Sequence, residues 1–179
     1  SYLSLQAVCT IMAANGLRVI DVEELPTHGG SLRVYAEHSE TNGVPTPEVL
    51  ALLSKEKLAG ICTTAFYERF QECADEVKND FIAFLVEAKR TGKTVVAYGA
   101  AAKGNTLINY AGIRPDLIHF VVDRNPAKQN HFMPGSRIPI VTENRLHEMR
   151  PDYVVILPWN LREEVMKQLT YIRAWGGRF

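Results

Sequence analysis

From residue 94 onward, short apolar segments alternate with helical segments, and this alternation constrains the fold more than any other feature. The run TVVAYGA is almost wholly apolar and ends in small residues, which is typical of a strand buried in a parallel sheet. Strands and helices that alternate at this spacing predict an α/β fold, with a Rossmann-like parallel sheet and flanking helices over residues 94–179. Further strands are expected at 119–123, 137–141, 153–158 and after Gly176-Gly177, and helices at 104–110, 142–149 and 162–175.

The beginning of the chain has a different pattern. Apolar residues at helical spacing predict a helix over residues 3–14, and Asn15-Gly16 predicts its end. The segments LRVIDVEEL (17–25) and SLRVYAEH (31–38) predict two strands joined by a turn at Gly29-Gly30. Together they predict an antiparallel hairpin that precedes the parallel sheet.

Between the hairpin and the sheet lies a segment rich in Ala, Leu, Glu and Lys. Pro47 predicts the start of a helix, with Thr46 as its cap. A break near Gly60 divides the segment, and the second helix is expected over about 64–90. We therefore divide the chain at residues 1–44, 45–93 and 94–179.

Charge and composition exclude several classes of protein. Lys+Arg and Asp+Glu both number 20, a balance that argues against a nucleic-acid or anionic-membrane partner. We find neither an apolar stretch long enough to span a membrane nor a secretory leader, and we expect a cytoplasmic protein. The three cysteines are expected to be reduced and buried, without a metal site. The chain starts at Ser1 inside a helical pattern, so we expect a piece of a longer protein.

A glycine-containing loop follows the first strand of the predicted sheet and opens a helix. Its pattern is Gly-x-Ala-x-x-Gly from Gly99 to Gly104, a variant of the dinucleotide fingerprint with Ala101 at the second glycine position. Asp123 ends the next strand, where an acidic residue is placed to accept hydrogen bonds from a ribose. The methyl group of Ala101 weakens the case for NAD, and a simple packing turn stays open as an alternative.

Two further motifs attract attention. The Tyr35-Ala-Glu37-His38 segment offers a hydroxyl donor, a carboxylate and a general base, although taken alone the pattern favours the solvated polar face of an edge strand. Trp159 and Asn160 follow a predicted parallel strand, at the edge where ligands bind in open α/β sheets. Helix capping by Asn160 and packing of Trp159 are the alternatives.

Four blocks taken together resemble a known family. They are GGSLRVYAEH, VVAYGAAAKGNTLINYAGI, VVDRNPAKQNHFMPGSRIPI and DYVVILPWNLREEV, in this order. The combination resembles the C-terminal half of the S-adenosylmethionine-dependent C-methyltransferases that act on nucleotide-linked keto-sugars in deoxysugar pathways. This resemblance implies that residues 1–44 are the C-terminal part of a methyltransferase domain and that residues 94–179 form the substrate-binding domain. Residues 45–93 are then the helical connector between these two domains.

The resemblance also implies roles for individual residues. It makes His38 the base that removes the proton next to the sugar ketone, Tyr35 a group that binds or polarises the sugar, and Glu37 a group that orients His38 or contacts the sugar. It assigns the sheet edge to a nucleoside diphosphate, through Gly99, Ala100, Lys103, Gly104, Asn105, Asp123, Trp159 and Asn160. S-adenosylmethionine and zinc would be bound upstream, so we expect no methyl transfer by this chain alone.

Two other functions remain open at this point. One is a Rossmann module that binds NAD(P) or coenzyme A through Gly99, Gly104 and Asp123, without methyl chemistry. The other is a structural or docking domain in which the glycine loop is only a turn.

Overall fold

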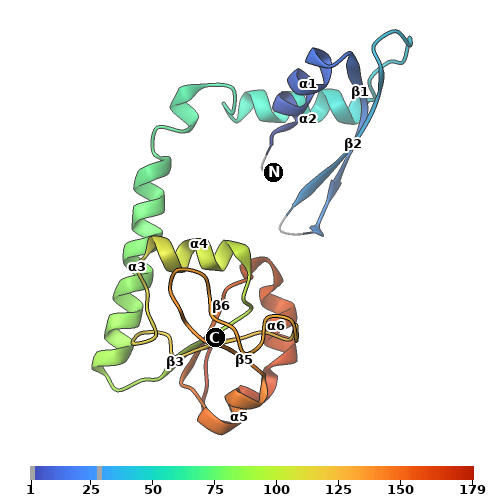
Figure 1. Cartoon of the computed structure of the whole chain (residues 1–179). Helices are drawn as coiled ribbons and strands as arrows, with labels where there is room; N and C mark the ends of the chain where they lie inside the picture. Colours follow the sequence, from blue (N-terminus) through green and yellow to red (C-terminus); the bar gives the residue numbers. More distant parts are fainter. Residues whose placement is uncertain (1–2, 28–29) are drawn as a thin grey trace. The chain divides into compact units, whose positions relative to one another are not determined.

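A computed structural model of the chain describes residues 3–27 and 30–179. The chain divides into two compact units, residues 1–72 and 73–179 (Figure 1). The first unit contains a two-stranded antiparallel sheet with helices, and the second contains a four-stranded parallel sheet with helices. The predicted α/β class with an N-terminal hairpin is therefore confirmed.

The first unit is built around the hairpin. Helix α1 spans Leu5–Ala14, and the Ser4 hydroxyl caps it by accepting a hydrogen bond from the Ala7 N–H at 3.1 Å. Strands β1 (Leu17–Leu25) and β2 (Ser31–His38) pair antiparallel, as predicted to the residue. The turn predicted at Gly29-Gly30 lies partly outside the described residues.

A small apolar core joins the hairpin to α1 and to α2 (Pro47–Leu58). Its buried side chains are Leu5, Val19, Val22, Val49 and Leu52. The buried Glu56 carboxylate, on α2, accepts hydrogen bonds from the Leu5 and Gln6 N–H groups at 2.6 and 2.8 Å. These two donors belong to the first turn of α1, so one helix caps the other across the unit.

The α2 helix ends before Gly60, whose φ of +81° lies in the left-handed region that glycine tolerates. The short 3-10 helix η2 (Thr64–Phe66) follows, and α3 spans Phe70–Arg90. The predicted break is confirmed, but the second helix begins at residue 70 and not at 64. Between the two helices the chain forms turns, in which the Thr63 N–H donates to the Gly60 carbonyl and the Tyr67 N–H donates to the Thr64 carbonyl.

The parallel sheet of the second unit has the strand order β5-β4-β3-β6. Its strands are β3 (Val95–Tyr98), β4 (Val121–Val122), β5 (Ile140–Val141) and β6 (Tyr153–Ile156). Its helices are α4 (Ala102–Tyr110), α5 (Asn144–Met149) and α6 (Arg162–Gln168), followed by the 3-10 helix η4 (Thr170–Trp175). The 3-10 helix η3 (Trp159–Leu161) precedes α6.

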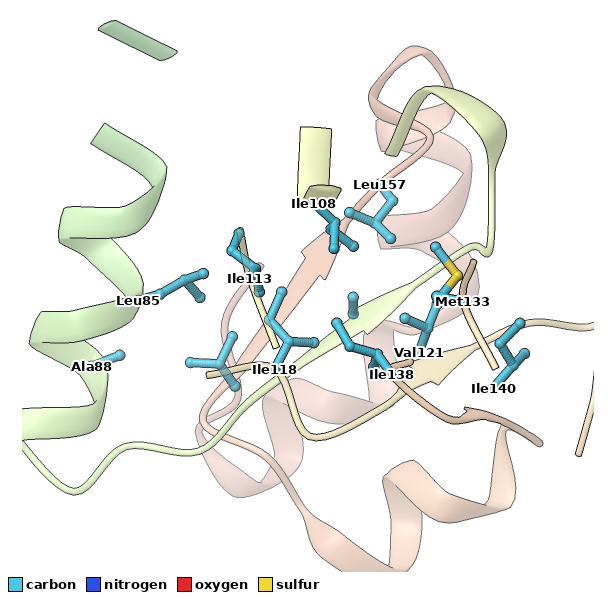
Figure 2. Close-up of a cluster of buried hydrophobic side chains, with 12 residues drawn as sticks. Leu85, Ala88, Ile108, Ile113, Ile118, Val121, Met133, Ile138, Ile140 and Leu157 are labelled. Atoms are coloured by element: carbon cyan, nitrogen blue, oxygen red, sulfur yellow. The ribbon is translucent and has the colours of Figure 1, made fainter. Parts of the chain in front are cut away.

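Both faces of this sheet are covered. Side chains of β3 alternate between two buried clusters: Val95 and Ala97 pack under α3 and α4, whereas Val96 and Tyr98 pack under α5, α6 and η4. Figure 2 shows the first cluster, in which Leu85 of α3 and Ile108 of α4 lie over the sheet. A strand that is buried on both faces explains the continuous apolar run that the sequence displays.

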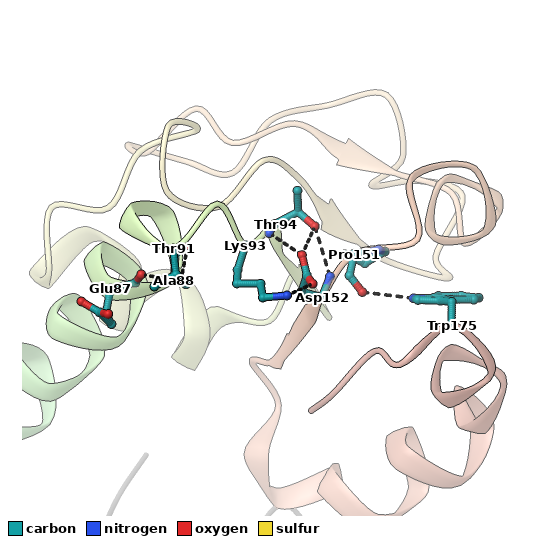
Figure 3. A network of polar contacts seen from close by, with 8 residues as sticks. All are labelled: Glu87, Ala88, Thr91, Lys93, Thr94, Pro151, Asp152 and Trp175. Atoms are coloured by element: carbon teal, nitrogen blue, oxygen red, sulfur yellow. Dashed lines mark hydrogen bonds and ion pairs between the residues drawn. The ribbon is translucent and has the colours of Figure 1, made fainter.

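A polar network ties the beginnings of β3 and β6 together (Figure 3). The Asp152 carboxylate accepts hydrogen bonds from the Thr94 N–H at 2.8 Å and the Thr94 hydroxyl at 3.0 Å, and pairs with Lys93 at 2.9 Å. These hydrogen bonds and the Lys93 charge lower the pKa of Asp152 below its usual value. The Trp175 indole N–H donates to the Pro151 carbonyl at 3.1 Å nearby.

Some local predictions were wrong. Asn160 does not cap a helix, because the N-cap position of α6 is Leu161 and carries no side-chain cap. Helix α5 begins at Asn144 and not at residue 142. Thr46 occupies the N-cap position of α2, but its hydroxyl donates to Asp21 at 2.8 Å instead. The final strand is reduced to a single parallel bridge between Tyr153 and Arg178.

The predicted burial of the cysteines was also wrong. Cys62 and Cys73 are exposed, and Cys9 is partly buried in the first unit, where burial raises the pKa of its thiol. No described helix is long and apolar enough to cross a membrane.

Candidate functional site

The end of strand β2 carries Tyr35, Glu37 and His38. Tyr35 and Glu37 lie on one face of the hairpin, opposite Asp21 and Arg18 of β1. His38 lies on the other face and is exposed, at the last position of the strand. Among the described residues, no hydrogen bond or ion pair engages its imidazole, and the hydrogen bonds of His38 are made by its backbone.

The Tyr35 hydroxyl donates to the Glu23 carboxylate at 2.8 Å. The other oxygen of Glu23 pairs with Arg33 at 2.8 Å, on the same face of the hairpin. Tyr35 is 39% exposed, so its ring remains accessible while its hydroxyl has a fixed direction. The phenol is thus held as a polar group at the surface of the first unit.

Glu37 has protein partners of its own. Its Oε1 atom accepts hydrogen bonds from Arg18 Nη2 at 3.0 Å and from the Gly43 N–H at 2.9 Å. Burial alone would raise the pKa of Glu37, but hydrogen bonds from Arg18 and from the Gly43 N–H lower it below the usual value. The carboxylate makes no described contact with the His38 imidazole, so the structure does not bring these two predicted groups together.

The glycine loop of the second unit lies at the carboxyl end of the parallel sheet. Gly99 has a φ of +87°, and a Cβ there would lie 2.5 Å from Pro158 Cδ. A Cβ on Gly104 would lie 2.5 Å from Leu157 Cβ. Both glycines therefore permit close packing of the loop against the segment that follows β6, which is the role proposed by the packing alternative.

The loop also presents the beginning of helix α4. Ala101 occupies the N-cap position and supplies no side-chain cap to the first-turn N–H groups. An uncapped helix N-terminus favours an anionic group through its N–H donors and its dipole. Lys103 lies in this first turn, with its ammonium 5.9 Å from the centroid of the Trp159 ring.

Asp123 follows β4 and is 9% exposed. Its Oδ2 atom accepts from the Ala100 N–H at 2.8 Å and from Lys128 at 3.2 Å, and its Oδ1 accepts from the Asn125 N–H at 2.8 Å. Lys128 also donates to the Ala100 carbonyl at 3.0 Å. In this structure the carboxylate thus ties the glycine loop to the segment after β4.

Two hollows lie near these residues. A pocket of about 600 Å³ is lined by Ala100, Ala101, Ala102, Asn105, Ala127, Lys128, His131, Phe132, Met133, Pro134 and Ile140. The buried Asn105 Oδ1 has no hydrogen-bond partner among the described residues. A smaller pocket of about 430 Å³ is lined by residues 159–164, including Trp159 and Asn160.

Comparison with known proteins identifies the family. The C-methyltransferase C-terminal domain matches residues 26–179. The chain belongs to the C-methyltransferase family. It is 34% identical, over all of its 179 residues, to C-methyltransferase NovU of Streptomyces niveus. The chain spans 43% of the length of that C-methyltransferase.

The matched region contains the end of β2 and the entire second unit, so it includes every predicted site residue. Within the matched C-terminal domain, Ala100 and Asn105 line one pocket, and the Lys103 ammonium lies 5.9 Å from the centroid of the Trp159 ring. Gly99, Gly104 and Asp123 organise the loop. The role of each in binding stays a prediction.

Residues that sequence analysis missed include Arg18, which holds Glu37, and the pocket segment from His131 to Pro134. Arg18 could have been found only from the register of the hairpin.

Among the described residues, no three His, Cys, Asp or Glu side chains are grouped so that they could hold a metal ion.

Proposed function

We propose that this chain is the substrate-binding and base-bearing portion of an S-adenosylmethionine-dependent C-methyltransferase that acts on a nucleoside-diphosphate keto-sugar. The observation that supports the base most directly is the position of His38. Its imidazole is exposed, has no described partner and ends a strand inside the matched family region. A neutral imidazole is suited to accept a proton near neutral pH.

The proposed first step is proton abstraction from the carbon next to the sugar ketone. The C–H bond breaks, its proton moves to a ring nitrogen of His38, and its electron pair becomes the enolate with negative charge on the former ketone oxygen. A hydrogen-bond donor near that oxygen stabilises the developing charge. The Tyr35 hydroxyl, which donates to Glu23, lies on the opposite face of the hairpin from His38, so we assign it to binding the sugar and not to this oxygen.

When bound, S-adenosylmethionine supplies the electrophilic methyl group that the enolate carbon takes up, and S-adenosylhomocysteine leaves. We assign none of the described residues to this cofactor and place its site in the remaining part of a longer protein. A zinc site stays a prediction about that part as well. We accordingly expect no methyl transfer by residues 1–179 alone.

The nucleoside diphosphate is assigned to the second unit. The uncapped N-terminus of α4 and the Lys103 ammonium favour its phosphates. The neighbouring pocket of about 600 Å³, with Ala100 and Asn105 in its wall, has room for a nucleoside. Asp123 accepts hydrogen bonds through both oxygens from the glycine loop and from the segment after β4, so we assign it to holding the loop that carries this site.

Calorimetry on the chain with dTDP, NAD and coenzyme A tests this assignment. We expect dTDP to bind more tightly than the other two, and Lys103→Met to weaken it about tenfold through loss of a phosphate contact. Lys89→Met is the control, because Lys89 forms an exposed ion pair with Asp116 at 3.0 Å. Tighter binding of NAD or coenzyme A would support the dinucleotide alternative, and an absence of dTDP binding would contradict the assignment.

The base is tested by His38→Ala in the complete protein. Loss of a general base lowers the rate by about 10²–10⁴-fold, and we expect this range for methyl transfer to a dTDP-4-keto-6-deoxyhexose. The exposed His119 of the second unit provides the control variant His119→Ala. A His38→Ala enzyme with undiminished activity would remove His38 from the mechanism.

A further inference from the structure

Strand β1 contains a bulge that decides which residue faces Arg18. From Leu25↔Ser31 to Asp21↔Tyr35 the hairpin keeps one register, and the register then shifts by one residue between Val19 and Asp21. Without this shift, Arg18 would lie opposite His38. With it, Arg18 lies opposite Glu37, on the face away from the base.

The bulge is held by Thr46, the residue at the N-cap position of helix α2. The carbonyl of Ile20, the extra residue, accepts a hydrogen bond from the Thr46 N–H at 2.9 Å. The Thr46 hydroxyl donates to the neighbouring Asp21 at 2.8 Å. A residue left out of the ladder thus receives a partner from outside the sheet, and the shifted register is fixed.

Arg18 and Glu37 also form hydrogen bonds with the loop that follows His38. Glu37 Oε1 accepts from Arg18 and from the Gly43 N–H, and Arg18 also donates to the Thr41 carbonyl. The loop fits closely, because a Cβ on Gly43 would lie 2.1 Å from Glu37 Oε1. Arg18 and Glu37 are 37% and 23% exposed, so the ion pair is only partly screened by water.

The same loop also forms hydrogen bonds with the backbone of His38. The His38 carbonyl accepts hydrogen bonds from the Thr41 N–H at 3.0 Å and from the Thr41 hydroxyl at 2.5 Å. The Ser39 N–H donates to the Gly16 carbonyl at 2.9 Å. The peptide groups on the C-terminal side of His38 are therefore anchored, although its side chain is exposed.

We infer that Arg18 and Glu37 are positioning residues for the base: through Thr41 and Gly43 they fix the backbone of His38 and so aim its imidazole at the substrate. This inference rests on the proposed role of His38. It separates Glu37 from the substrate and makes its carboxylate part of a clamp, formed by Arg18, Glu37, Thr41 and Gly43. A misplacement of about 1 Å in a reacting group costs as much as 10²-fold in rate, which is the effect such a clamp prevents.

The experiment measures proton abstraction by itself. The complete protein is incubated with S-adenosylhomocysteine and with dTDP-4-keto-6-deoxyglucose that carries deuterium next to the ketone, and loss of deuterium to water is followed by NMR. Three variants disturb the clamp in different ways. Arg18→Met removes the cation, Glu37→Gln removes the charge while keeping the shape, and Gly43→Ala displaces the carboxylate with a methyl group.

We expect each variant to lower the maximal exchange rate at least tenfold and to leave KM within about twofold of the wild-type value. Glu40→Gln, an exposed glutamate of the same loop, should match the wild type. A parallel measurement of amide exchange in the 179-residue chain should show faster exchange of Gly43 N–H in the Glu37→Gln and Arg18→Met variants. Retained exchange protection elsewhere in β1 and β2 establishes that these variants are folded.

The outcomes separate the two levels of the proposal. Deuterium loss that disappears in His38→Ala but is unchanged in the folded clamp variants overturns the inference and leaves the base in place. Deuterium loss that is undiminished in His38→Ala overturns the proposed base, and the inference with it. A raised KM with an unchanged maximal rate would show that Glu37 binds the sugar, which also overturns the positioning role.

Discussion

The two units bury their apolar side chains in different ways. Among the described residues, the first unit has five buried side chains in its core, whereas the second has twelve on one face of its sheet and nine on the other. A small core stabilises less and leaves more of the fold to specific polar contacts. The predicted base lies on the unit with the smaller core, where the Glu56 cap and the clamp replace apolar packing.

The hairpin is therefore held by polar contacts at defined points. Removing one such contact should loosen the first unit without affecting the second. Both tryptophans, Trp159 and Trp175, belong to the second unit, so indole fluorescence reports its unfolding separately. Amide exchange resolves the first unit.

The largest effect is expected from the core of the second unit. Leu85 is fully buried on α3, and Leu85→Ala leaves a cavity that should lower the free energy of unfolding of this unit by about 2–5 kcal/mol. Urea unfolding followed by tryptophan fluorescence measures it. Val77 on the same helix is 57% exposed, so Val77→Ala should change little. Equal effects of the two variants would contradict the packing described for α3.

The next largest effect concerns the helix cap of the first unit. Glu56→Ala leaves two N–H groups at the beginning of α1 without their acceptor, and should destabilise the unit by about 2 kcal/mol. Faster amide exchange in residues 5–25 would measure this loss. The exposed Lys57 gives the control Lys57→Ala. A shift of the tryptophan transition by Glu56→Ala would show that the units do not unfold independently.

A smaller effect is expected where α4 packs on the segment after β6. Gly104→Ala places a methyl group 2.5 Å from Leu157 Cβ, so the helix must shift, at a cost of about 1–2 kcal/mol in the second unit. Thr106→Ala, at an exposed position of the same helix, is the control. Tryptophan-detected unfolding compares them, and a Gly104→Ala variant as stable as the wild type would refute the close approach.

The smallest effect depends on pH. The pKa of Asp152 is lower in the folded state than its usual value of 3.8, so its ionised form stabilises the second unit above that value. The contribution is fully present near pH 7 and is lost as pH falls below about 4 through the folded pKa. Asp152→Asn should therefore differ from the wild type at pH 7, and the difference should be smaller at pH 3, below the usual pKa. Urea midpoints at both pH values measure this decrease, and a difference that is independent of pH would contradict it.

Sequence periodicity predicted the hairpin strands to the residue because Leu32 and Val34 alternate with exposed Arg33 and Tyr35. It did not predict the bulge at Ile20. A bulge changes neither composition nor the type of element, and its stabilising partner, Thr46, lies beyond the hairpin. The pairing of Arg18 with Glu37 was therefore not accessible from the sequence.

For the glycine loop, the type of element was predictable from the sequence, but its neighbours in space were not. Its position between β3 and α4 was predicted from the motif, but the same pattern serves either a ligand or packing. The contacts of Gly99 and Gly104 are made with Pro158 and Leu157, which come after β6 and more than fifty residues later. Only the folded arrangement identifies these neighbours. The capping predictions failed for a similar reason, since the Thr46 hydroxyl found a partner in Asp21 outside its own helix.

The pairing of residue 178 with β6 has a consequence for the behaviour of the protein in concentrated solution. Strand β6 forms one edge of the parallel sheet, and its outer side would otherwise offer unpaired N–H and C=O groups. The Val154 N–H donates to the Arg178 carbonyl, and the Arg178 N–H donates to the Asp152 carbonyl, both at 2.8 Å. Exposed strand edges recruit other chains and promote aggregation. The segment after Gly176 thus covers this edge of the sheet, and deleting it would leave β6 open to pairing between molecules.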